Sequence, residues 1–296
     1  MKIIVTGAGG LLGREIITRK QSGFEIVGLS HGELDVTNQK SIELALLEHK
    51  PDAIVNCAVV VNVDVCEKDS GLCFAINRDG VANVLTTIKK IGRPTTFVQI
   101  SSSEVFGRVK EGEYKIEGYK EDDEPMPVTN YQKSKAEAES IVAEFGRRNL
   151  DVLPHWFILR AAWLYGKGRK TFVEGFLKDL QESKELSVIG DQWRSPTWTK
   201  YFTDSLFELL TGKYQSGIYH GAAEVGRGEA TTPQVIEEIT KCLGPEKVRA
   251  TAKLIKRDDF FKIPRAPSNV LLNTKLPRLP YWRDMLREYL GTHSGF

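Results

Sequence analysis

Two periodicities alternate along the first half of the chain. Short, continuously apolar runs at 2–6, 25–29, 53–56 and 96–101 are separated by longer stretches with helical spacing. Apolar strands that alternate with helices are typical of a parallel sheet covered on both faces. We therefore expect an α/β fold, with a Rossmann-type doubly wound parallel sheet.

The helical stretches have recognisable ends. They cover 11–20, 38–50, 74–91 and 130–148, and a further strand is expected over 154–159. Thr37-Asn38 is suited to cap the second helix, and Pro51 ends it. The segment 108–127 is polar, charged and interrupted by Gly and Pro, so we expect a long loop that could cover a site.

The pattern becomes less regular after residue 160. Helices are expected at 171–182, 200–211 and 232–243, with short strands at 186–189 and 217–220. No Gly/Ser linker separates the two parts. We therefore predict a dinucleotide-binding domain over 1–160 and a smaller, mixed, mainly substrate-binding lobe over 161–296, closely packed together.

The composition of the chain limits the classes of binding partner that it favours. The chain has 296 residues, with 41 Lys and Arg against 39 Asp and Glu, a net charge of +2. This balance favours neither nucleic acid nor a membrane surface as a partner. No leader-like or membrane-spanning run is evident. The cysteines at 57, 66, 73 and 242 lack metal spacing, so we expect free thiols in a cytoplasmic protein, with a homodimer left open.

A glycine-rich turn follows the first strand. Gly7, Gly10 and Gly13 have the spacing GxxGxxG, and Leu11 opens the next helix. Such a turn brings the backbone close to a pyrophosphate at a positive helix N-terminus, and the last glycine lets the helix pack on the sheet. We expect these four residues to contact a dinucleotide.

The end of the second strand bears on the choice of cofactor. An acidic residue there would bind the ribose 2′-hydroxyl of NADH, but the chain has Leu29-Ser30-His31. Ser30 and His31, together with Arg14, can accept a 2′-phosphate. We therefore favour NADPH, and the nearby Glu33 keeps NADH open.

Tyr131 and Lys135 are candidates for proton transfer. Residues four apart lie on one face of a helix, so the ammonium can stabilise a phenolate. Lowering the tyrosine pKa by about three units takes roughly 4 kcal/mol. Ser102, after the strand at 96–101, is the candidate donor to the substrate oxygen. The alternative for Tyr131 and Lys135 is a solvated helix face without a catalytic role. The alternative for Ser102 is a turn at the end of the strand.

Together these motifs resemble the extended short-chain dehydrogenase/reductase family. The matching motifs are Gly7/Gly10/Gly13, Asn56-Cys57-Ala58, Ile76-Asn77, Ser101-Ser102-Ser103 and the Tyr131/Lys135 pair. Within the family, the segments 158–166, 190–192 and 264–269 are similar to reductases of nucleotide-linked sugars. The resemblance implies reduction of the 4-keto group of a nucleotide-linked deoxysugar by NAD(P)H.

The resemblance also assigns residues. It implies that Asp35, Asn56 and Ala58 line the cofactor, and that Ser102, Tyr131 and Lys135 are catalytic. Trp163 and Gln192 would lie near the sugar or its nucleotide, with core packing as the alternative for Trp163. The carboxylates that bind magnesium in some reductases have no match here, so no metal is expected.

Three departures from the reductase pattern bear on the substrate. Ser103 and Glu104 stand where an aspartate and a tyrosine are usual, and Val60 and Val61 replace a Tyr-Thr pair. Arg194 replaces a glycine, and either pairs with a phosphate or lies in solvent. These residues are expected to face the substrate.

Two other functions stay open on the sequence alone. Glu104 resembles part of a dehydratase Asp-Glu pair, which suggests an epimerase or dehydratase with tightly held NAD. A non-catalytic NADP-binding regulatory subunit, like the beta subunit of methionine adenosyltransferase, would share the fold without the activity.

Overall fold

A six-stranded sheet forms the larger part of the molecule. The computed structural model describes residues 1–182 and 185–292. The strand order is β2-β1-β3-β4-β5-β9, and every pairing is parallel. The strands are β1 (Lys2–Thr6), β2 (Glu25–Leu29), β3 (Ala53–Asn56), β4 (Thr96–Ser102), β5 (Trp156–Ala161) and β9 (Gly217–Gly221). The expected Rossmann-type sheet is confirmed.

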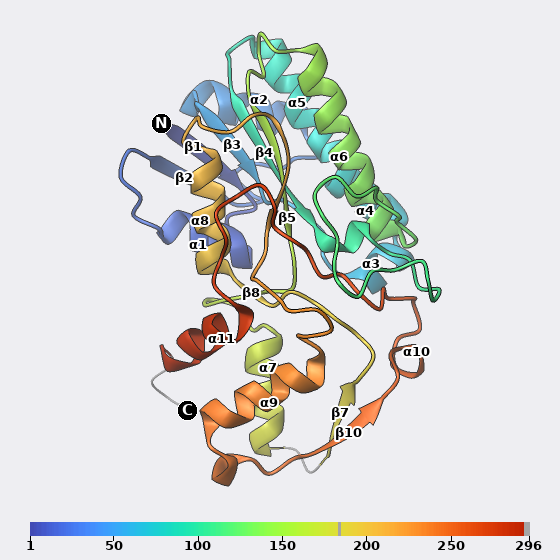
Figure 1. Cartoon of the computed structure of the whole chain (residues 1–296). Helices are drawn as coiled ribbons and strands as arrows, with labels where there is room; N and C mark the ends of the chain where they lie inside the picture. The colour runs from blue at the N-terminus through green and yellow to red at the C-terminus, as the bar shows by residue number, and fades with distance from the viewer. Residues whose placement is uncertain (183–184, 293–296) are drawn as a thin grey trace.

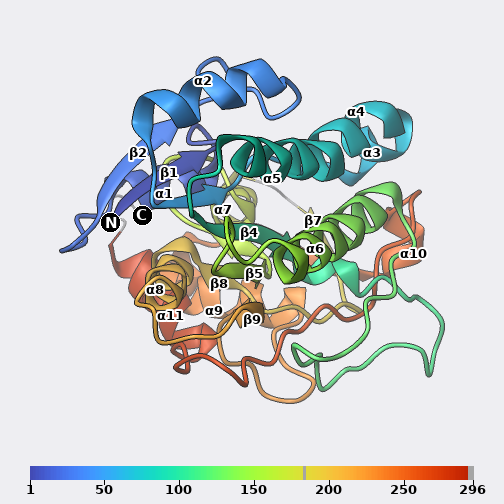
Figure 2. The ribbon, with the colours of Figure 1, turned by 90° about the horizontal axis from the view of Figure 1, so that it is seen from above.

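Helices cover both faces of this sheet (Figures 1 and 2). On one face lie α2 (Gln39–His49), α5 (Gly80–Ile91) and α6 (Asn130–Arg148), and on the other lie α1 (Leu11–Thr18) and α8 (Thr199–Leu209). Strand β1 shows why both faces are apolar. Ile4 packs into one core, whereas Ile3 and Val5 pack into the other, because alternate side chains of a strand point to opposite faces.

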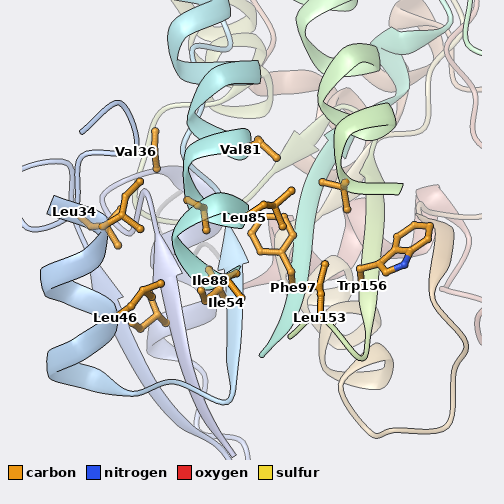
Figure 3. Close-up of a cluster of buried hydrophobic side chains, with 14 of the residues drawn as sticks. Leu34, Val36, Leu46, Ile54, Val81, Leu85, Ile88, Phe97, Leu153 and Trp156 are labelled. Atoms are coloured by element: carbon orange, nitrogen blue, oxygen red, sulfur yellow. The ribbon is translucent and has the colours of Figure 1, made fainter. Parts of the chain in front are cut away.

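The core between the sheet and helices α2, α5 and α6 is built from aliphatic side chains (Figure 3). Leu46 of α2, Leu85 and Ile88 of α5, and Phe97 of β4 meet there, all buried. Trp156 at the start of β5 closes one end of the cluster. This packing fixes α6, and therefore the Tyr131/Lys135 face, relative to the strand ends.

The expected single helix at 74–91 is wrong in its first part. Two short helices, α3 (Val63–Lys68) and α4 (Ser70–Phe74), come first, and a π-helical turn over Ala75–Asp79 joins α4 to α5. A π-turn holds one more residue than an α-turn and is frequent at functional sites. Here it contains Asn77, whose buried side chain binds both Val60 and Ser134.

The second part of the chain forms a smaller lobe below the sheet in Figure 1. Its helices are α7 (Phe172–Glu182), α9 (Thr232–Leu243), α10 (Arg257–Phe260) and α11 (Trp282–Gly291). Two pairs of short parallel strands accompany them: β6 (Leu164–Tyr165) with β8 (Thr197–Trp198), and β7 (Glu185–Ile189) with β10 (Thr251–Ile255). Helices α7, α9 and α11 and strands β6, β7 and β8 share one core that includes Trp282, Leu177 and Ile239.

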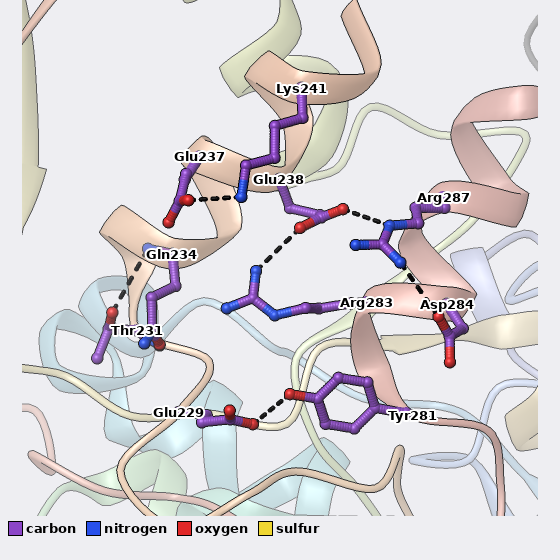
Figure 4. Close-up of polar contacts among 10 residues, drawn as sticks. All are labelled: Glu229, Thr231, Gln234, Glu237, Glu238, Lys241, Tyr281, Arg283, Asp284 and Arg287. Carbon is purple, nitrogen blue, oxygen red and sulfur yellow. Dashed lines mark hydrogen bonds and ion pairs between the residues drawn. The ribbon is translucent and has the colours of Figure 1, made fainter.

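Polar contacts lock α9 to α11 (Figure 4). The buried Glu238 carboxylate accepts hydrogen bonds from Arg283 at 2.9 Å and Arg287 at 2.5 Å. Thr231 and Gln234 form a capping box that starts α9. These contacts anchor the chain on both sides of the segment 261–281, which returns from the lobe to the large sheet.

Two long-range features complete the architecture. Strand β9 of the large sheet and helix α8, which covers one face of it, both come from beyond residue 160. Part of the predicted second region therefore belongs to the sheet of the first region.

The expected loop at 108–127 contains no helix or strand, as predicted. Its Tyr119 forms a β-bridge with Leu271 and stacks on Phe106 at 4.0 Å between ring centroids. Within 1–182 and 185–292, no helix is long and apolar enough to span a bilayer.

Candidate active site

A buried row of side chains connects the carboxyl ends of the central strands. Thr6 of β1 pairs in register with Asn56 of β3, which pairs with Gln99 of β4. The Thr6 hydroxyl donates to Asn56 Oδ1 at 2.6 Å, and Asn56 Nδ2 donates to Gln99 Oε1 at 2.8 Å. Parallel α/β sheets bind ligands at this edge, and the row holds its backbone in one arrangement.

The glycine-rich turn leaves this edge open to a large anion. Gly7 has φ +62°, and a Cβ there would lie 2.9 Å from the Cys57 carbonyl group. A Cβ at Gly13 would lie 2.5 Å from the Gly7 oxygen, so α1 packs tightly on the turn. Gly10 is the N-cap of α1 and offers no side-chain cap. The first N–H groups of α1 are therefore suited to a pyrophosphate, and Leu11 and Ala58 flank the same turn.

At the end of β2, an acid lies beside the expected ribose position. The Glu33 carboxylate accepts hydrogen bonds from the Ser30 N–H at 2.8 Å and hydroxyl at 2.7 Å. The Ser30 hydroxyl thereby lowers the pKa of Glu33. The His31 side chain is 82% exposed and lies 3.9 Å from Asp35 Oδ1. Arg14 points elsewhere, donating to the Gly9 carbonyl.

Helix α6 places the candidate proton donor. A capping box formed by Thr129 and Gln132 starts the helix directly before Tyr131. Tyr131 is buried, lines a cavity at the sheet edge and hydrogen-bonds with Ser102 at the end of β4. Lys135, one turn further on, donates to the Ile100 carbonyl at 2.6 Å. The structure thus brings the three candidate catalytic residues together.

The electrostatics of this set differ from the sequence argument in one respect. Burial raises the pKa of Tyr131, and the hydrogen bond with Ser102 lowers it only in part. Burial lowers the pKa of Lys135 to about 8, while the Glu139 carboxylate opposes the shift. The expected lowering of the tyrosine pKa is therefore reversed. The phenol is therefore protonated near neutral pH, as a proton donor must be, but burial alone makes it a weaker acid.

A second network, which the sequence argument did not assign, supports Tyr131. Asn77 Oδ1 accepts a hydrogen bond from the Val60 N–H at 2.8 Å, and Asn77 Nδ2 donates to Ser134 Oγ at 3.1 Å. The Ser134 hydroxyl donates to the Tyr131 carbonyl at 2.8 Å. In the sequence, the Ile76-Asn77 motif, which matched the family, was the signal that could have identified this network. The loop after β3 and the start of α6 are therefore held as one unit.

The cavity has a volume of about 420 Å³ and receives residues from both parts of the chain. Seven predicted residues line it: Val61, Ser102, Ser103, Glu104, Tyr131, Trp163 and Arg194. Further lining residues that were not assigned from the sequence include Asn62, Asp64, Arg265 and Asn269. Arg265 and Asn269 belong to a segment that carried the family resemblance but showed no periodicity.

Trp163 and Gln192 have different surroundings. Trp163 adopts φ +39° and stacks on Phe172, with 3.9 Å between ring centroids. Its ring also lies 5.3 Å from Arg194 Cζ, so Arg194 forms part of the cavity wall. Gln192 is buried and donates to the Ala266 carbonyl at 2.9 Å, outside the set of lining residues. The predicted substrate contact of Gln192 stays a prediction.

The four cysteines are free thiols. Burial raises the pKa of Cys57 to about 12, which makes it a poor nucleophile. Across the described ranges, no group of three His, Cys, Asp or Glu side chains is arranged to hold a metal ion.

Comparison with known proteins places this site in a family. The family model described as the RmlD substrate binding domain matches residues 1–293. The spore coat polysaccharide biosynthesis protein SpsK of Bacillus subtilis is 31% identical, covering 99% of this chain and 98% of that protein. A dTDP-4-dehydrorhamnose reductase of Streptomyces griseus is 33% identical, covering 85% and 80%.

A solved structure of a similar protein has the same fold over nearly its whole length. The dTDP-4-dehydrorhamnose reductase from Bacillus anthracis, crystallised in complex with NADP, superposes with a TM-score of 0.84 at 25% identity, covering 99% of each chain. The fold and site thus define an oxidoreductase of the short-chain dehydrogenase/reductase type. More particularly, the chain belongs to the RmlD substrate-binding-domain family. The sequence resemblance, which extended most specifically to dTDP-4-dehydrorhamnose reductase, is confirmed.

Proposed function

We propose that this protein reduces the 4-keto group of a dTDP-linked deoxysugar to an alcohol, with NADPH as the reductant. The observation that carries the proposal is the placement of the Ser102 and Tyr131 hydroxyls on one cavity at the sheet's carboxyl edge. The relative from Streptomyces griseus is named as such a reductase, which supports the substrate class.

The residues present fit the dinucleotide. A Cβ at Gly7 would meet the loop after β3, so only glycine leaves the close turn, and the uncapped N-terminus of α1 suits a diphosphate. Bound NADPH supplies the hydride that reaches the carbonyl carbon. Gly7, Gly10, Leu11 and Gly13 would hold its diphosphate, with Asn56 and Ala58 nearby, and Ser30, His31 and Asp35 its adenosine ribose.

The protein's own residues supply the proton. The Tyr131 phenol, which is protonated near neutral pH, donates a proton to the carbonyl oxygen as negative charge develops there. The Ser102 hydroxyl donates a hydrogen bond to the same oxygen and fixes its direction. The Lys135 ammonium donates to the Ile100 carbonyl, and because Lys135 lies one helical turn from Tyr131, its charge would stabilise the phenolate that remains.

NADPH and NADH should both be used, but with different efficiency. A bound NADP in the Bacillus anthracis reductase supports NADPH. The Glu33 carboxylate beside Ser30 works against a 2′-phosphate, because like charges repel. We therefore propose NADPH as the preferred cofactor and NADH as an accepted one.

A panel of dTDP-linked 4-keto sugars tests the function. NADPH absorbance is followed with each sugar, and the product alcohol is identified by mass. Stoichiometric oxidation of NADPH supports the proposal. An epimerase or dehydratase would carry NAD through purification and interconvert sugars without consuming NADPH. A regulatory subunit would bind NADPH but reduce no sugar.

A further inference from the structure

The cavity that Tyr131 lines is also lined by two arginines without adequate counter-ions. We infer that Arg194 and Arg265 together bind the diphosphate of the nucleotide sugar, and that Arg194 adds a second cation to this subsite. The inference rests on the proposed function, because it names the part of the same substrate that these residues hold.

Arg194 is held in place without a partner for its charge. Its guanidinium lies over Trp163, 5.3 Å from the ring centroid, and Trp163 itself stacks on Phe172. Within the described ranges, no side chain or carbonyl forms a hydrogen bond or ion pair with this guanidinium. Stacking leaves the edge of the planar group free, and this edge can bind two phosphate oxygens.

Arg265 is nearly as poorly satisfied. Its side chain is 10% exposed, and Nη2 makes one long contact of 3.5 Å with the exposed Asp64 carboxylate. Nη1 is buried and has no hydrogen-bond partner within the described chain. Asn269 Oδ1, in the same wall, is also buried without a partner. A buried donor without a partner costs free energy, so its persistence at a cavity points to a ligand.

The charges of the two arginines act on each other. Burial lowers the pKa of Arg194, Glu104 raises it, and the cation of Arg265 lowers it further. Two guanidinium groups that line one cavity are stabilised by a dianion, which the diphosphate of a nucleotide sugar supplies. A hydroxyl of the sugar could accept hydrogen bonds from one arginine but would not offset the repulsion between two.

Glu104 lines the same cavity as the reacting group and the two arginines. Its carboxylate acts electrostatically on both the Tyr131 phenol and the Arg194 guanidinium, and Gln132 Nε2 holds it at 3.2 Å. A phosphate is attracted by the two guanidinium groups, whereas the keto group has to reach the Ser102 and Tyr131 hydroxyls. The substrate is therefore oriented with its diphosphate toward Arg194 and its keto group toward Ser102.

Equilibrium binding to the NADP⁺-loaded protein tests the inference without requiring turnover. Dissociation constants for dTDP and thymidine are measured by calorimetry for the wild type, Arg194→Gly and Arg265→Met. Arg148→Met is the matched control, because Arg148 lies on the surface of α6 and, among the residues that the structure describes, pairs with Glu144 alone. Inorganic pyrophosphate is added as a competitor of dTDP.

We expect each cavity variant to weaken dTDP binding about tenfold to a hundredfold, the range for losing charge-assisted hydrogen bonds. Thymidine binding should not change, pyrophosphate should compete with dTDP, and Arg148→Met should behave as the wild type. Unchanged dTDP affinity in Arg194→Gly, or equal losses for dTDP and thymidine, would overturn the inference.

A second measurement keeps the test decisive if a variant does not fold. The wild-type affinity for dTDP should fall with rising salt, whereas that for thymidine should not. Salt-independent dTDP binding contradicts the diphosphate subsite. Reduction of 4-keto sugars by the wild type is measured separately, so failure of the subsite is distinguishable from failure of the proposed function.

Discussion

Arg160 and Glu139 form a bidentate ion pair in the interior, one turn beyond Lys135 on the same face of α6 as Tyr131 and Lys135. Arg160 Nη2 lies 2.7 Å from Glu139 Oε2, and Nε lies 2.9 Å from Oε1. The Ser101 hydroxyl also donates to Glu139, at 2.5 Å. The pair joins β5 to α6, so it sets the distance between the helix and the strand end that contains Ser102.

Glu139→Gln should therefore destabilise the fold strongly. It leaves the buried Arg160 without a counter-ion, which typically costs about 3–5 kcal/mol. Urea unfolding followed by circular dichroism measures the loss. Glu144→Gln, which breaks an exposed pair with Arg148 on the same helix, should cost only about 0.3–0.5 kcal/mol. Similar losses in both variants would show that the buried pair has no special role.

Tyr131→Phe should separate chemistry from binding. The change removes one hydroxyl and keeps the ring, so the packing of α6 is preserved. Loss of the general acid should lower kcat by about 10²–10⁴, while the dissociation constant for NADPH stays near that of the wild type. Steady-state kinetics with an accepted 4-keto sugar, and a fluorescence titration with NADPH, check the two parts. Turnover close to wild type would rule out Tyr131 as the proton donor.

Activity should fall as the pH rises through about 8, the pKa of Lys135. Below this pH the ammonium is charged and can stabilise the phenolate; above it the charge is lost, while the tyrosine, with its raised pKa, is still protonated. The pH profile of kcat/KM locates this basic limb. In Lys135→Met the limb should disappear along with most of the activity. A wild-type profile that is flat through this pH would contradict the assignment.

The same ionisation affects stability with the opposite sign. The pKa of Lys135 is depressed in the folded state to about 8, below its ordinary 10.5. Between these values the unfolded chain binds the proton more tightly, so this residue's contribution to the free energy of unfolding should increase with pH. Urea unfolding of the wild type and Lys135→Met across this interval isolates the contribution. A difference that does not change with pH would exclude the shift.

Glu33→Gln should strengthen the preference for NADPH. Removing the negative charge beside Ser30 relieves repulsion of the 2′-phosphate and weakens the contact with the ribose hydroxyls of NADH. The ratio of kcat/KM for NADPH to that for NADH should rise roughly tenfold. Glu25→Gln, at the exposed start of β2, the strand that precedes Glu33, is the control and should leave the ratio unchanged. A ratio that is equal in all three proteins would place the 2′-phosphate elsewhere.

The strands near the cofactor could be predicted closely because local pattern determines them. The runs that became β1, β2 and β3 are apolar; Gly7 follows the first and Ser30 the second, and the third ends at the polar Asn56. The helix start at Asn130 was likewise marked by local signals. Such features depend on neighbours in the sequence, so sequence reasoning finds them.

The far wall of the cavity depends on tertiary contacts that no local pattern encodes. Arg265 and Asn269 lie in an irregular segment, and their position follows from contacts such as the Asn269 side chain with the Ser103 and Phe106 carbonyls. The π-turn around Asn77 was missed because its distortion is imposed by Val60 and Ser134. The direction of the Tyr131 pKa shift was missed because burial depends on the complete fold.

The path of the chain through β9 has a consequence for the design of chimeras. Strand β9 pairs with β5 along Phe157–Ala161, although the small lobe's first elements intervene in the sequence. A fragment that stops after residue 161 would expose β5 as a long apolar edge, which is prone to strand addition and aggregation. A graft that exchanges the substrate lobe must therefore leave α8 and β9 with the host and replace two separate pieces, one before and one after them.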